Sequence, residues 1–384
     1  MTHRILVIGA GIAGLAAAVG LQRRGHDVTI VEERSDTSSG AGISIWPNAL
    51  AALDELGLGD AVRGAGGRVT AGAMRWHDGS WLRRPSAERF VTALGEPLVV
   101  VRRVVLMKLL ADALAVGTIE SGVAASALVA TESGVRVTLS DNTTRDVDAV
   151  VGADGVGSVV ARQLNGPLNR RYAGYTAWRG VATHDLYPAL SGETMGSGTE
   201  FGHVPLGPDH TYWFATERGP EGRTSPEGEL AYLQSKYGSW ADPIPALLAA
   251  TDSAGVLRND LYDRDEARQW AHGPIVLVGD AAHPMRPHLG QGGCQGLEDA
   301  AILMHCLGPS IDPATAFARF VAARRPRARA LARESKLIGQ LVNVRPAFLG
   351  AAAMRASSLV PEAVLTRHLA SIAARSAFVL PDER

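Results

Sequence analysis

Residues 5–14 read Ile-Leu-Val-Ile-Gly-Ala-Gly-Ile-Ala-Gly, and this stretch decides the fold of the chain. The apolar run 5–8 is typical of a strand that is buried on both faces. The alanine- and leucine-rich residues 11–24 predict a helix that Gly25 ends, and residues 28–31 predict a second buried strand. Two parallel strands joined by a helix form a right-handed βαβ unit, so the chain is expected to begin with an α/β domain.

Three glycines give the turn after the first strand the pattern G-x-G-x-x-G. Gly9 permits the tight turn, Gly11 lets a pyrophosphate approach the backbone, and Gly14 lets the helix pack closely on the strand. The start of the helix offers free N–H groups and a partial positive charge to phosphates. Glu32 ends the second strand, where a carboxylate can accept hydrogen bonds from ribose hydroxyls. The pattern predicts dinucleotide binding rather than a turn that serves packing alone, but it does not distinguish FAD from NAD.

Composition excludes several classes of function. The chain has 384 residues, enough for two lobes, and its formal net charge of −1 argues against a nucleic-acid or acidic-membrane partner. Its two cysteines, Cys294 and Cys306, fall on one predicted helix about 18 Å apart, which is too far for a disulfide and offers no metal-ligand spacing. No apolar run is long enough to span a bilayer, and no secretory leader is evident. We expect a cytoplasmic protein that binds neither metal nor membrane.

The rest of the chain alternates between helical and extended patterns. Helices are expected at residues 49–56, 103–115, 229–238, 244–250 and 293–307, and strands at residues 136–139, 147–152 and 275–278. Aromatic and β-branched residues alternate with polar ones over residues 172–215, which predicts an antiparallel sheet. Residues 63–97 are predicted to be irregular. The alanine-rich last 70 residues predict helices, with a break at Pro326.

The predicted parallel strands lie far apart in the sequence, which indicates one nucleotide-binding domain assembled from separate segments. We assign this domain to residues 1–75, 98–170 and 271–335. A substrate-binding domain is expected at residues 76–97 and 171–270, followed by a C-terminal helical segment at residues 336–384.

Several arginines cluster near the end of the predicted nucleotide-binding domain. Their spacing fits the solvated face of a helix, which we favour over a nucleic-acid-binding patch. The cluster comprises Arg324, Arg325, Arg327, Arg329 and Arg333.

Two later stretches indicate that the nucleotide is FAD. Residues 152–155, Gly-Ala-Asp-Gly, follow a predicted strand, and residues 279–284, Gly-Asp-Ala-Ala-His-Pro, follow another. The second stretch continues through Pro287 to a Gly-Gln-Gly-Gly run at residues 290–293. In this order the motifs resemble the single-component flavoprotein monooxygenases with the p-hydroxybenzoate hydroxylase fold, over nearly the whole chain. The resemblance implies an α/β fold with a Rossmann-like FAD-binding domain, an inserted antiparallel β-sheet substrate domain and C-terminal helices.

The resemblance also implies FAD contacts at matching positions. Glu32 would hold the adenosine ribose, Arg103 would lie along the cofactor, and Asp280 would bind near the pyrophosphate. The helix that begins near Gly293 directs its positive end at the flavin, which is anionic when reduced. The full set of expected FAD-binding residues is Gly9, Gly11, Ala13, Gly14, Glu32, Glu33, Arg34, Arg103, Asp154, Asp280, Pro287, Gly290, Gly292 and Gly293.

The nicotinamide coenzyme is expected to lack a domain of its own. The sequence contains no second G-x-G-x-x-G motif between a strand and a helix, so NADH or NADPH would bind transiently. Asp154 is expected to be shared between cofactor support and coenzyme binding, with a simple turn residue as the alternative. Relatives usually place an arginine three residues after the serine at position 158. Here that residue is Ala161, and Arg162 follows.

The resemblance implies a monooxygenase that hydroxylates an aromatic or heteroaromatic small molecule. NADH or NADPH would reduce FAD, O2 would form a flavin C4a-hydroperoxide, and an electron-rich carbon would attack its distal oxygen. Epoxidation stays open, as does a dehydrogenase or oxidase reaction without oxygen insertion. A flavin halogenase is disfavoured because residues 240–245, WADPIP, lack the second tryptophan of the W-x-W-x-I-P motif. A non-catalytic flavin-binding module is disfavoured by the complete set of motifs. A monomer or a homodimer is expected.

Oxygen transfer requires an apolar cavity, because water would let the hydroperoxide decay. The candidate walls are Trp46, Trp178, His203, Tyr212, Phe214, Pro287 and Leu289. A nearby base would activate a phenolic substrate. We expect His288, His203 and Tyr212 to be the catalytic residues, with His288 close to the flavin because its loop joins two flavin-contacting stretches. His283 is expected to support the turn after Asp280, and Arg286 could serve an anionic substrate.

The substrate itself stays open. Residues 42–48 and 290–294 are similar to the urate hydroxylase branch of the family. That branch carries an arginine where this chain has Glu200 and an aspartate where it has His288, and both differences argue against urate. Residues 284–288, Pro-Met-Arg-Pro-His, are closer to hydroxylases of salicylate-like or pyridine acids.

Overall fold

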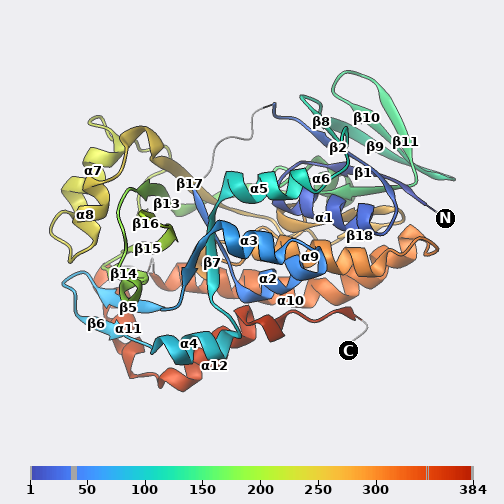
Figure 1. Ribbon diagram of the computed structural model, residues 1–384. Coiled ribbons are helices and arrows are strands. Elements are labelled where there is room, and N and C mark those ends of the chain that lie inside the picture. Colours follow the sequence, from blue (N-terminus) through green and yellow to red (C-terminus); the bar gives the residue numbers. More distant parts are fainter. Residues whose placement is uncertain (1, 36–40, 343, 345, 382–384) are drawn as a thin grey trace.

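The opening motif lies in the middle of a six-stranded, mostly parallel sheet (Figure 1). A computed structural model of the protein describes residues 2–35, 41–342, 344 and 346–381. Strand β1 pairs in parallel with β2 and β12, and β12 pairs in parallel with β19, so the three predicted segments form one sheet. In pairing order the strands are β18 (Ala271–His272), β19 (Ile275–Leu277), β12 (Ala149–Gly152), β1 (Arg4–Ile8), β2 (Asp27–Glu32) and β8 (Ile119–Ser121).

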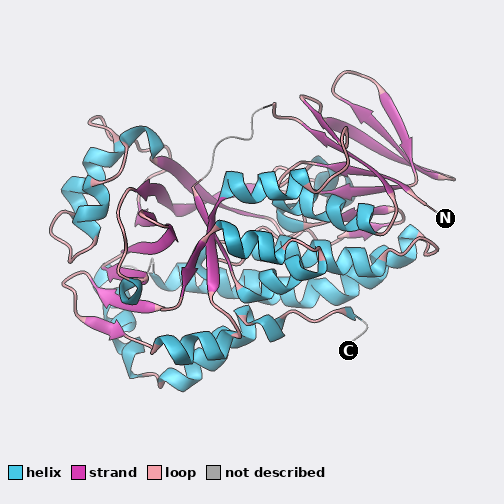
Figure 2. Ribbon diagram, in the orientation of Figure 1, coloured by secondary structure: helices cyan, strands magenta, loops and turns pink. Residues whose placement is uncertain are grey.

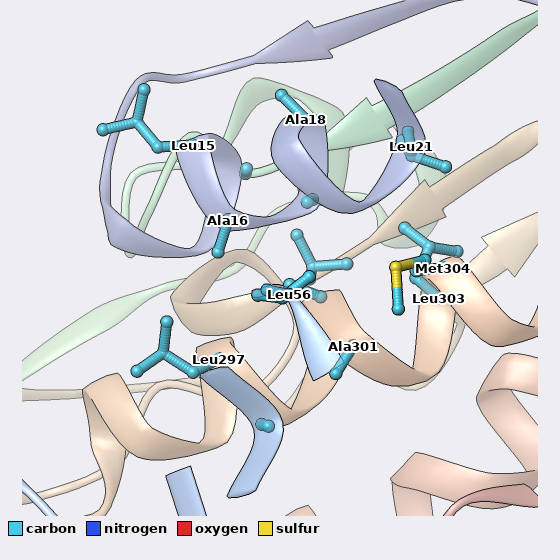
Figure 3. Close-up of a cluster of buried hydrophobic side chains, with 14 of the residues drawn as sticks. Leu15, Ala16, Ala18, Leu21, Leu56, Leu297, Ala301, Leu303 and Met304 are labelled. Carbon is cyan, nitrogen blue, oxygen red and sulfur yellow. The ribbon is translucent and has the colours of Figure 1, made fainter. Parts of the chain in front are cut away.

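Helices α1 (Ile12–Arg23) and α9 (Gly292–Cys306) pack against each other and supply much of the main hydrophobic core (Figure 3). Small residues allow this close approach. A Cβ added at Gly20 would lie 3.0 Å from the Cβ of Met304, and one added at Gly296 would lie 3.0 Å from the Cβ of Ala13. Each helix begins directly after a glycine-rich loop, so their contact fixes the two loops relative to each other.

The second large sheet has seven strands. All neighbouring pairs are antiparallel except β5 and β14, so the antiparallel sheet expected at residues 172–215 is present but gains strands from earlier in the chain. The pairing order is β17 (Leu257–Arg264), β13 (Arg170–Ala182), β16 (His210–Arg218), β15 (Thr199–Gly207), β14 (Gly192–Gly196), β5 (Ala73–Trp76) and β6 (Trp81–Arg83). Residues 63–97, expected to be irregular, contain β5, β6, α4 (Ala87–Leu94) and β4 (Gly67–Val69). That expectation was wrong because strands of three or four residues show no measurable alternation.

The two faces of the seven-stranded sheet have different surroundings. Side chains alternate between faces along each strand, and the register therefore assigns every residue to one of them. On the outer face, Trp178, Phe201 and Trp213 pack under α7 (Glu229–Tyr237) and α8 (Ile244–Ala249). On the inner face, Tyr212 and Phe214 of β16 pack with Trp46 and Leu289, which lie in two loops far apart in the sequence.

Smaller elements complete the fold (Figure 2). A three-stranded sheet of β9, β10 and β11 projects from the six-stranded sheet, and β3, β7 and β4 form another between the two large sheets. No helix in the described ranges is long and apolar enough to cross a membrane. The remaining bounds are β3 (Gly42–Ile45), β7 (Leu98–Arg102), β9 (Ala125–Thr131), β10 (Gly134–Leu139), β11 (Thr144–Val147), α2 (Pro47–Glu55), α3 (Gly59–Ala65), α5 (Arg103–Asp112), α6 (Val159–Asn165), α10 (Pro313–Val342), α11 (Ala347–Ala356) and α12 (Glu362–Ala373).

Helix α10 corrects two expectations. It runs without a break through Pro326, although proline removes one backbone hydrogen bond and clashes with the preceding turn. Of the five clustered arginines only Arg333 is exposed, and Arg324 is fully buried, so most of the cluster does not form a solvated face. Its guanidinium bonds Asp299 at 2.7 Å and also bonds Glu298, and Arg327 bonds Glu298 at 3.0 Å. These ion pairs hold α10 to α9 on both sides of the proline.

The buried carboxylates depend on these arginines for charge compensation. Burial alone would raise the pKa of Asp299, but the charges of His283 and Arg324 lower it below its ordinary value. Glu298 is likewise buried, and it also accepts a hydrogen bond of 2.6 Å from the amide of Asn48 on α2. One ionic cluster therefore joins α2, α9 and α10.

Replacing Arg324 with methionine should destabilise the fold strongly. The substitution leaves Glu298 and Asp299 with fewer compensating charges in the core, which should cost about 3–5 kcal/mol of unfolding free energy. Urea unfolding followed by circular dichroism measures the loss. The matched control is Arg333→Met on the exposed side of the same helix, which should change the value by less than about 0.5 kcal/mol. A loss for Arg324→Met as small as that of the control would contradict this view of the cluster.

Candidate cofactor and substrate site

An open cavity of about 310 Å³ lies at the carboxyl edge of the six-stranded sheet. It is lined by the turn after β1, the end of β2, the start of α5 and the turn after β12. Of the predicted cofactor-binding residues it contains Gly9, Gly11, Glu32, Glu33, Arg34, Arg103 and Asp154. Segments from three separate parts of the chain thus meet at one site, as the parallel strand order requires.

The three motif glycines serve different purposes in this turn. Gly9 has a φ of +103°, and a Cβ there would lie 2.5 Å from the carbonyl oxygen of Ala153. A Cβ on Gly14 would lie 1.9 Å from the carbonyl oxygen of Gly9. By contrast, a Cβ on Gly11 would meet nothing within 4 Å, and this residue starts α1 without a side-chain cap. Gly11 therefore leaves open space in front of the uncapped N–H groups of a helix, which suits a pyrophosphate.

Two charged residues at this cavity have defined partners, Glu32 in the backbone and Arg103 in a carboxylate. The carboxylate of Glu32 accepts hydrogen bonds from the N–H of Ala10 at 2.7 Å and from the N–H of Arg34 at 3.0 Å. Arg103 is attracted to the carboxylate of Asp280, which begins the turn after β19. A nucleotide in the cavity would therefore find a carboxylate at one end and a guanidinium beside a second carboxylate at the other.

Asp154 has a structural task in addition to lining the cavity. Its carboxylate accepts hydrogen bonds from the hydroxyl of Ser158 at 2.5 Å and from the N–H of Val159 at 2.7 Å. It thereby holds the turn before helix α6 together with the N-cap residue Ser158, which agrees with the alternative expectation of a turn residue. Arg162 donates to the carbonyl oxygen of Gly157 at 2.6 Å on the same turn. Coenzyme binding by Asp154 stays a prediction.

The second glycine-rich loop, residues 279–293, is fixed by Asp299. This carboxylate accepts a hydrogen bond of 2.8 Å from the N–H of Gly279 and lies 2.6 Å from Nε2 of His283. His283 therefore supports the turn after Asp280, as expected. The predicted residues Asp280, Pro287, Gly290, Gly292 and Gly293 all lie on this loop or at the start of α9, next to the cavity rather than in its lining.

The loop has the properties that a bound flavin requires. Gly290 has a φ of +61°, and a Cβ there would lie 2.9 Å from Nε1 of Trp46. That indole N–H is buried and has no hydrogen-bond partner among the described residues. A buried donor without a partner is costly unless an incoming group satisfies it. The glycines, the uncapped start of α1 and this N–H together fit FAD.

The inner face of the seven-stranded sheet carries a chain of polar contacts to the same loop. Nε2 of His288 lies 2.9 Å from the hydroxyl of Tyr175, and its Nδ1 lies 3.5 Å from Oε1 of Glu200. The hydroxyl of Thr216 donates to the same Glu200 oxygen at 3.0 Å. Only 2% of the His288 side chain is exposed, so its contacts are fixed by packing. The structure thus places His288, which belongs to the second glycine-rich loop, against the inner face of the sheet.

Tyr212 lies on this face too, and its catalytic role stays a prediction. Its ring covers Gly42, where a Cβ would lie 2.5 Å from Cγ of the tyrosine. Burial raises the pKa of Tyr212, and the charge of Arg179 and its hydrogen bond to the phenol oppose that shift. Phe214, Trp46 and Leu289 surround it, so four of the candidate pocket walls do gather in one place.

His203 and Trp178 lie elsewhere. Both side chains point to the outer face. Trp178 pairs with Ala215 and His203 pairs with Trp213, and these partners alternate along β16 with the inner-face residues Tyr212 and Phe214. His203 is buried against Thr194 and Arg75. Burial lowers its pKa to about 3, with the charge of Arg75 adding to the shift, so it is neutral. The two histidines predicted to act as bases therefore do not share a site. A separate cavity of about 190 Å³ opens beside Trp178, lined also by Tyr232 and Arg223.

Sequence reasoning did not identify Tyr175 as a partner of His288, and it noted Glu200 only as a difference from relatives. The sequence signal that could have found them is the alternation of side chains between the two faces of a strand. Tyr175 and Glu200 face the same side as Tyr212 once the strands are paired. The pairing itself, with a shift between Tyr172 and Thr176, is not readable from the residues.

Substitution of Gly11 should separate cofactor binding from folding. Gly11→Ala meets no protein atom, so the unfolding free energy should stay within about 0.5 kcal/mol of the parent protein. The added methyl group occupies the space in front of the helix start, and the Kd for FAD should rise at least about tenfold. Fluorescence titration of apoprotein with FAD measures it. Gly64→Ala, which also meets nothing within 4 Å but lies on α3, is the control. Equal FAD affinity in both variants would contradict the assignment.

The comparisons with known proteins agree with this geometry. Residues 2–335 match the protein family described as FAD binding domain. The chain is 36% identical to an aurachin C monooxygenase/isomerase of Stigmatella aurantiaca over 90% of its own length and 91% of the relative. It is 34% identical to a 3-amino-4-hydroxybenzoate 2-monooxygenase of Streptomyces cremeus, covering 88% and 87% of the two chains.

A solved structure shows the same fold with FAD bound. Klebsiella pneumoniae HpxO, in complex with FAD and uric acid, superposes with a TM-score of 0.90 at 27% identity, covering 96% of each chain. The family match, the relatives and the shared fold confirm the α/β architecture with its mixed and antiparallel sheets and C-terminal helices. The chain belongs to the FAD-binding family and is an FAD-dependent monooxygenase of the kind that acts on aromatic or heteroaromatic compounds.

Proposed function

We propose that the enzyme hydroxylates a small aromatic or heteroaromatic substrate, with O2 and NADH or NADPH as co-substrates, in a pocket between the inner face and the loop of residues 284–293. The observation that carries the proposal is the contact of His288 with Tyr175 and Glu200. It joins the loop expected beside the flavin to a sheet face that presents both aromatic and ionisable groups. The names of two relatives, which refer to a hydroxybenzoate and to uric acid, support a substrate of this kind.

Bound FAD would supply the reduction and activation of O2, and Gly9, Gly11, Glu32, Arg103 and Asp280 would hold it. The chain must then orient the substrate ring and keep water away from it. Tyr212, Phe214, Trp46 and Leu289 form an apolar group on the inner face that can do both.

Tyr175, His288 and Glu200 can move a proton away from a substrate hydroxyl. Burial raises the pKa of Tyr175, so its phenol stays protonated and can exchange one proton for another. The hydroxyl would pass its proton to Nε2 of His288 and take up the proton of the substrate. Glu200, near Nδ1, would stabilise the positively charged imidazole ring. A deprotonated phenol is richer in electrons and therefore reacts faster with an electrophilic oxygen.

The direct test is isotope incorporation. The purified holoenzyme is supplied with 18O2, NADH or NADPH, and a panel of hydroxylated aromatic and heteroaromatic compounds. We expect one compound to stimulate coenzyme oxidation and to yield a product heavier by one 18O atom. Coenzyme oxidation that releases only hydrogen peroxide with every compound would contradict hydroxylation and favour an oxidase reaction.

Substitution of His288 should lower kcat strongly, whereas substitution of His203 should leave kcat nearly unchanged. His288→Gln removes the group that accepts the proton and should lower kcat roughly 100-fold, with less loss at high pH, where the substrate ionises unaided. His203→Gln replaces a neutral ring on the outer face and should keep kcat within about threefold of the parent enzyme. The kcat of each variant is measured as product formed per bound flavin between pH 6 and pH 9, in steps of about half a pH unit. An unchanged kcat in His288→Gln would exclude the proposed proton path.

A further inference from the structure

We infer that the pocket selects an uncharged aromatic ring that donates hydrogen bonds, and that it discriminates against aromatic carboxylates. The inference rests on the proposed function, because it places the substrate on the inner face of the sheet. It deepens that proposal by stating which charge the substrate carries. The evidence is the arrangement of acidic and basic side chains around Gly202.

Two acidic residues flank Gly202 on the inner face. In the strand register Glu193 of β14 lies directly opposite Gly202, and Glu200 lies two residues from it along β15. The missing side chain at Gly202 makes room for the ring of Phe214, which comes within 2.2 Å of where a Cβ would stand. An aromatic surface is therefore bordered by two carboxyl groups.

The two carboxyl groups interact with each other. Burial, together with the negative charge of Glu200, raises the pKa of Glu193 to about 8. At neutral pH Glu193 keeps its proton and can donate a hydrogen bond, while Glu200 can accept one. A carboxylate ligand placed here would add a second negative charge beside Glu200 at a site where burial limits screening by solvent.

The basic side chains near this cluster already have protein partners. Arg286 binds Asp263 through two hydrogen bonds of 2.8 and 2.7 Å and also bonds the phenol of Tyr175. Lys336 lies 3.7 Å from the Asp263 carboxylate. Nε2 of His288 faces the hydroxyl of Tyr175, and its Nδ1 lies 3.5 Å from Oε1 of Glu200, so this ring is the basic neighbour of Glu200 among these side chains. The expectation that Arg286 could serve an anionic substrate is therefore not supported by its contacts.

Two further arginines of the sheet, Arg179 and Arg75, also have partners of their own. Arg179 shares the inner face, but Phe214 and Gly202 stand between it and Glu193 in the register. Arg179 also donates to Asn259 at 3.2 Å and bonds the phenol of Tyr212. Arg75 neighbours Glu193 in sequence register but points to the outer face, toward His203. A ligand with O–H or N–H groups and no negative charge matches the groups that remain, Glu200 as acceptor and Glu193 as donor.

This conclusion differs from the resemblance of residues 284–288 to hydroxylases of salicylate-like and pyridine acids. That loop contributes Arg286, which the fold commits to Asp263. The sheet supplies Glu193 and Glu200, and neither residue belongs to a motif. The charge of the pocket is therefore set by the sheet rather than by the loop.

The test uses pairs of compounds that share a shape and differ in charge. The probes are salicylate with salicylamide, and 3-amino-4-hydroxybenzoate with 3-amino-4-hydroxybenzamide. Each is titrated into oxidised holoenzyme at about pH 6.5, and the change in flavin absorbance gives Kd without turnover. We expect each amide to bind at least about tenfold more tightly than its acid.

Substitutions then show which residue sets the preference. Glu200→Gln keeps the shape but removes the charge and should reduce the amide-to-acid ratio at least about fivefold, whereas Glu193→Gln should leave it within about twofold because that group is already uncharged. Glu217→Gln is the matched control, since Glu217 lies on the outer face of the same sheet and pairs with Lys236. Glu200→Ala is the second variant if the glutamine variant fails to fold.

Three results would overturn the inference. These are equal or tighter binding of the acids by the parent enzyme, an unchanged ratio in both Glu200 variants, and failure of all four probes to bind. The outcome is independent of the hydroxylation test. An enzyme that binds the amides more tightly but never incorporates 18O would contradict the proposed hydroxylation and support the charge selection. Efficient hydroxylation of the acids would support hydroxylation and contradict the charge selection.

Discussion

The buried contacts of Asp299 organise the site more than any others. One carboxylate binds the backbone N–H of Gly279, the ring of His283 and the guanidinium of Arg324, all within 2.8 Å. An isolated charge in a protein core is expensive, and it is tolerated here because each oxygen has charged or polar partners. The turn that begins the second glycine-rich loop is thereby tied to α9 and α10 at once. If this carboxylate lost its partners, both the loop and the helix behind it would be free to move.

Helix α10 also holds the middle of this loop. The hydroxyl of Ser335 on α10 donates to the carbonyl oxygen of Arg286 at 2.5 Å, next to His288. A Cβ on Gly339 would lie 2.5 Å from Nε2 of His288, so the backbone of α10 packs directly against the imidazole ring. The residues expected beside the flavin and those on the inner face are therefore positioned by one long helix. This explains why α10 continues through Pro326, since its contacts on both sides of the proline outweigh one missing hydrogen bond.

The parts of the fold that could be predicted are those in which a local motif needs a particular residue type at a particular position. The G-x-G-x-x-G turn, the acidic end of β2 and the glycine-rich start of α9 each predict a cofactor contact, and the first two line one cavity in the structure. Residues that depend on strand pairing could not be predicted in the same way. His203 and Tyr212 are both polar aromatic residues on neighbouring strands, yet they face opposite sides, because one step of register reverses a side chain. Tyr175 was missed, and Glu200 was noted only as a difference from relatives, for the same reason. Arg324 was expected on a solvated face because an arginine without a visible partner is normally exposed.

A crystal structure of the holoenzyme with 3-amino-4-hydroxybenzamide bound would test the account most directly. We predict that the ring lies on the inner face against Phe214, with its polar groups toward Glu200 and the hydroxyl of Tyr175, and with the flavin beside residues 287–293. The contradicting result would be a ligand in the outer-face cavity between Trp178 and Tyr232, with the inner face closed by its own side chains.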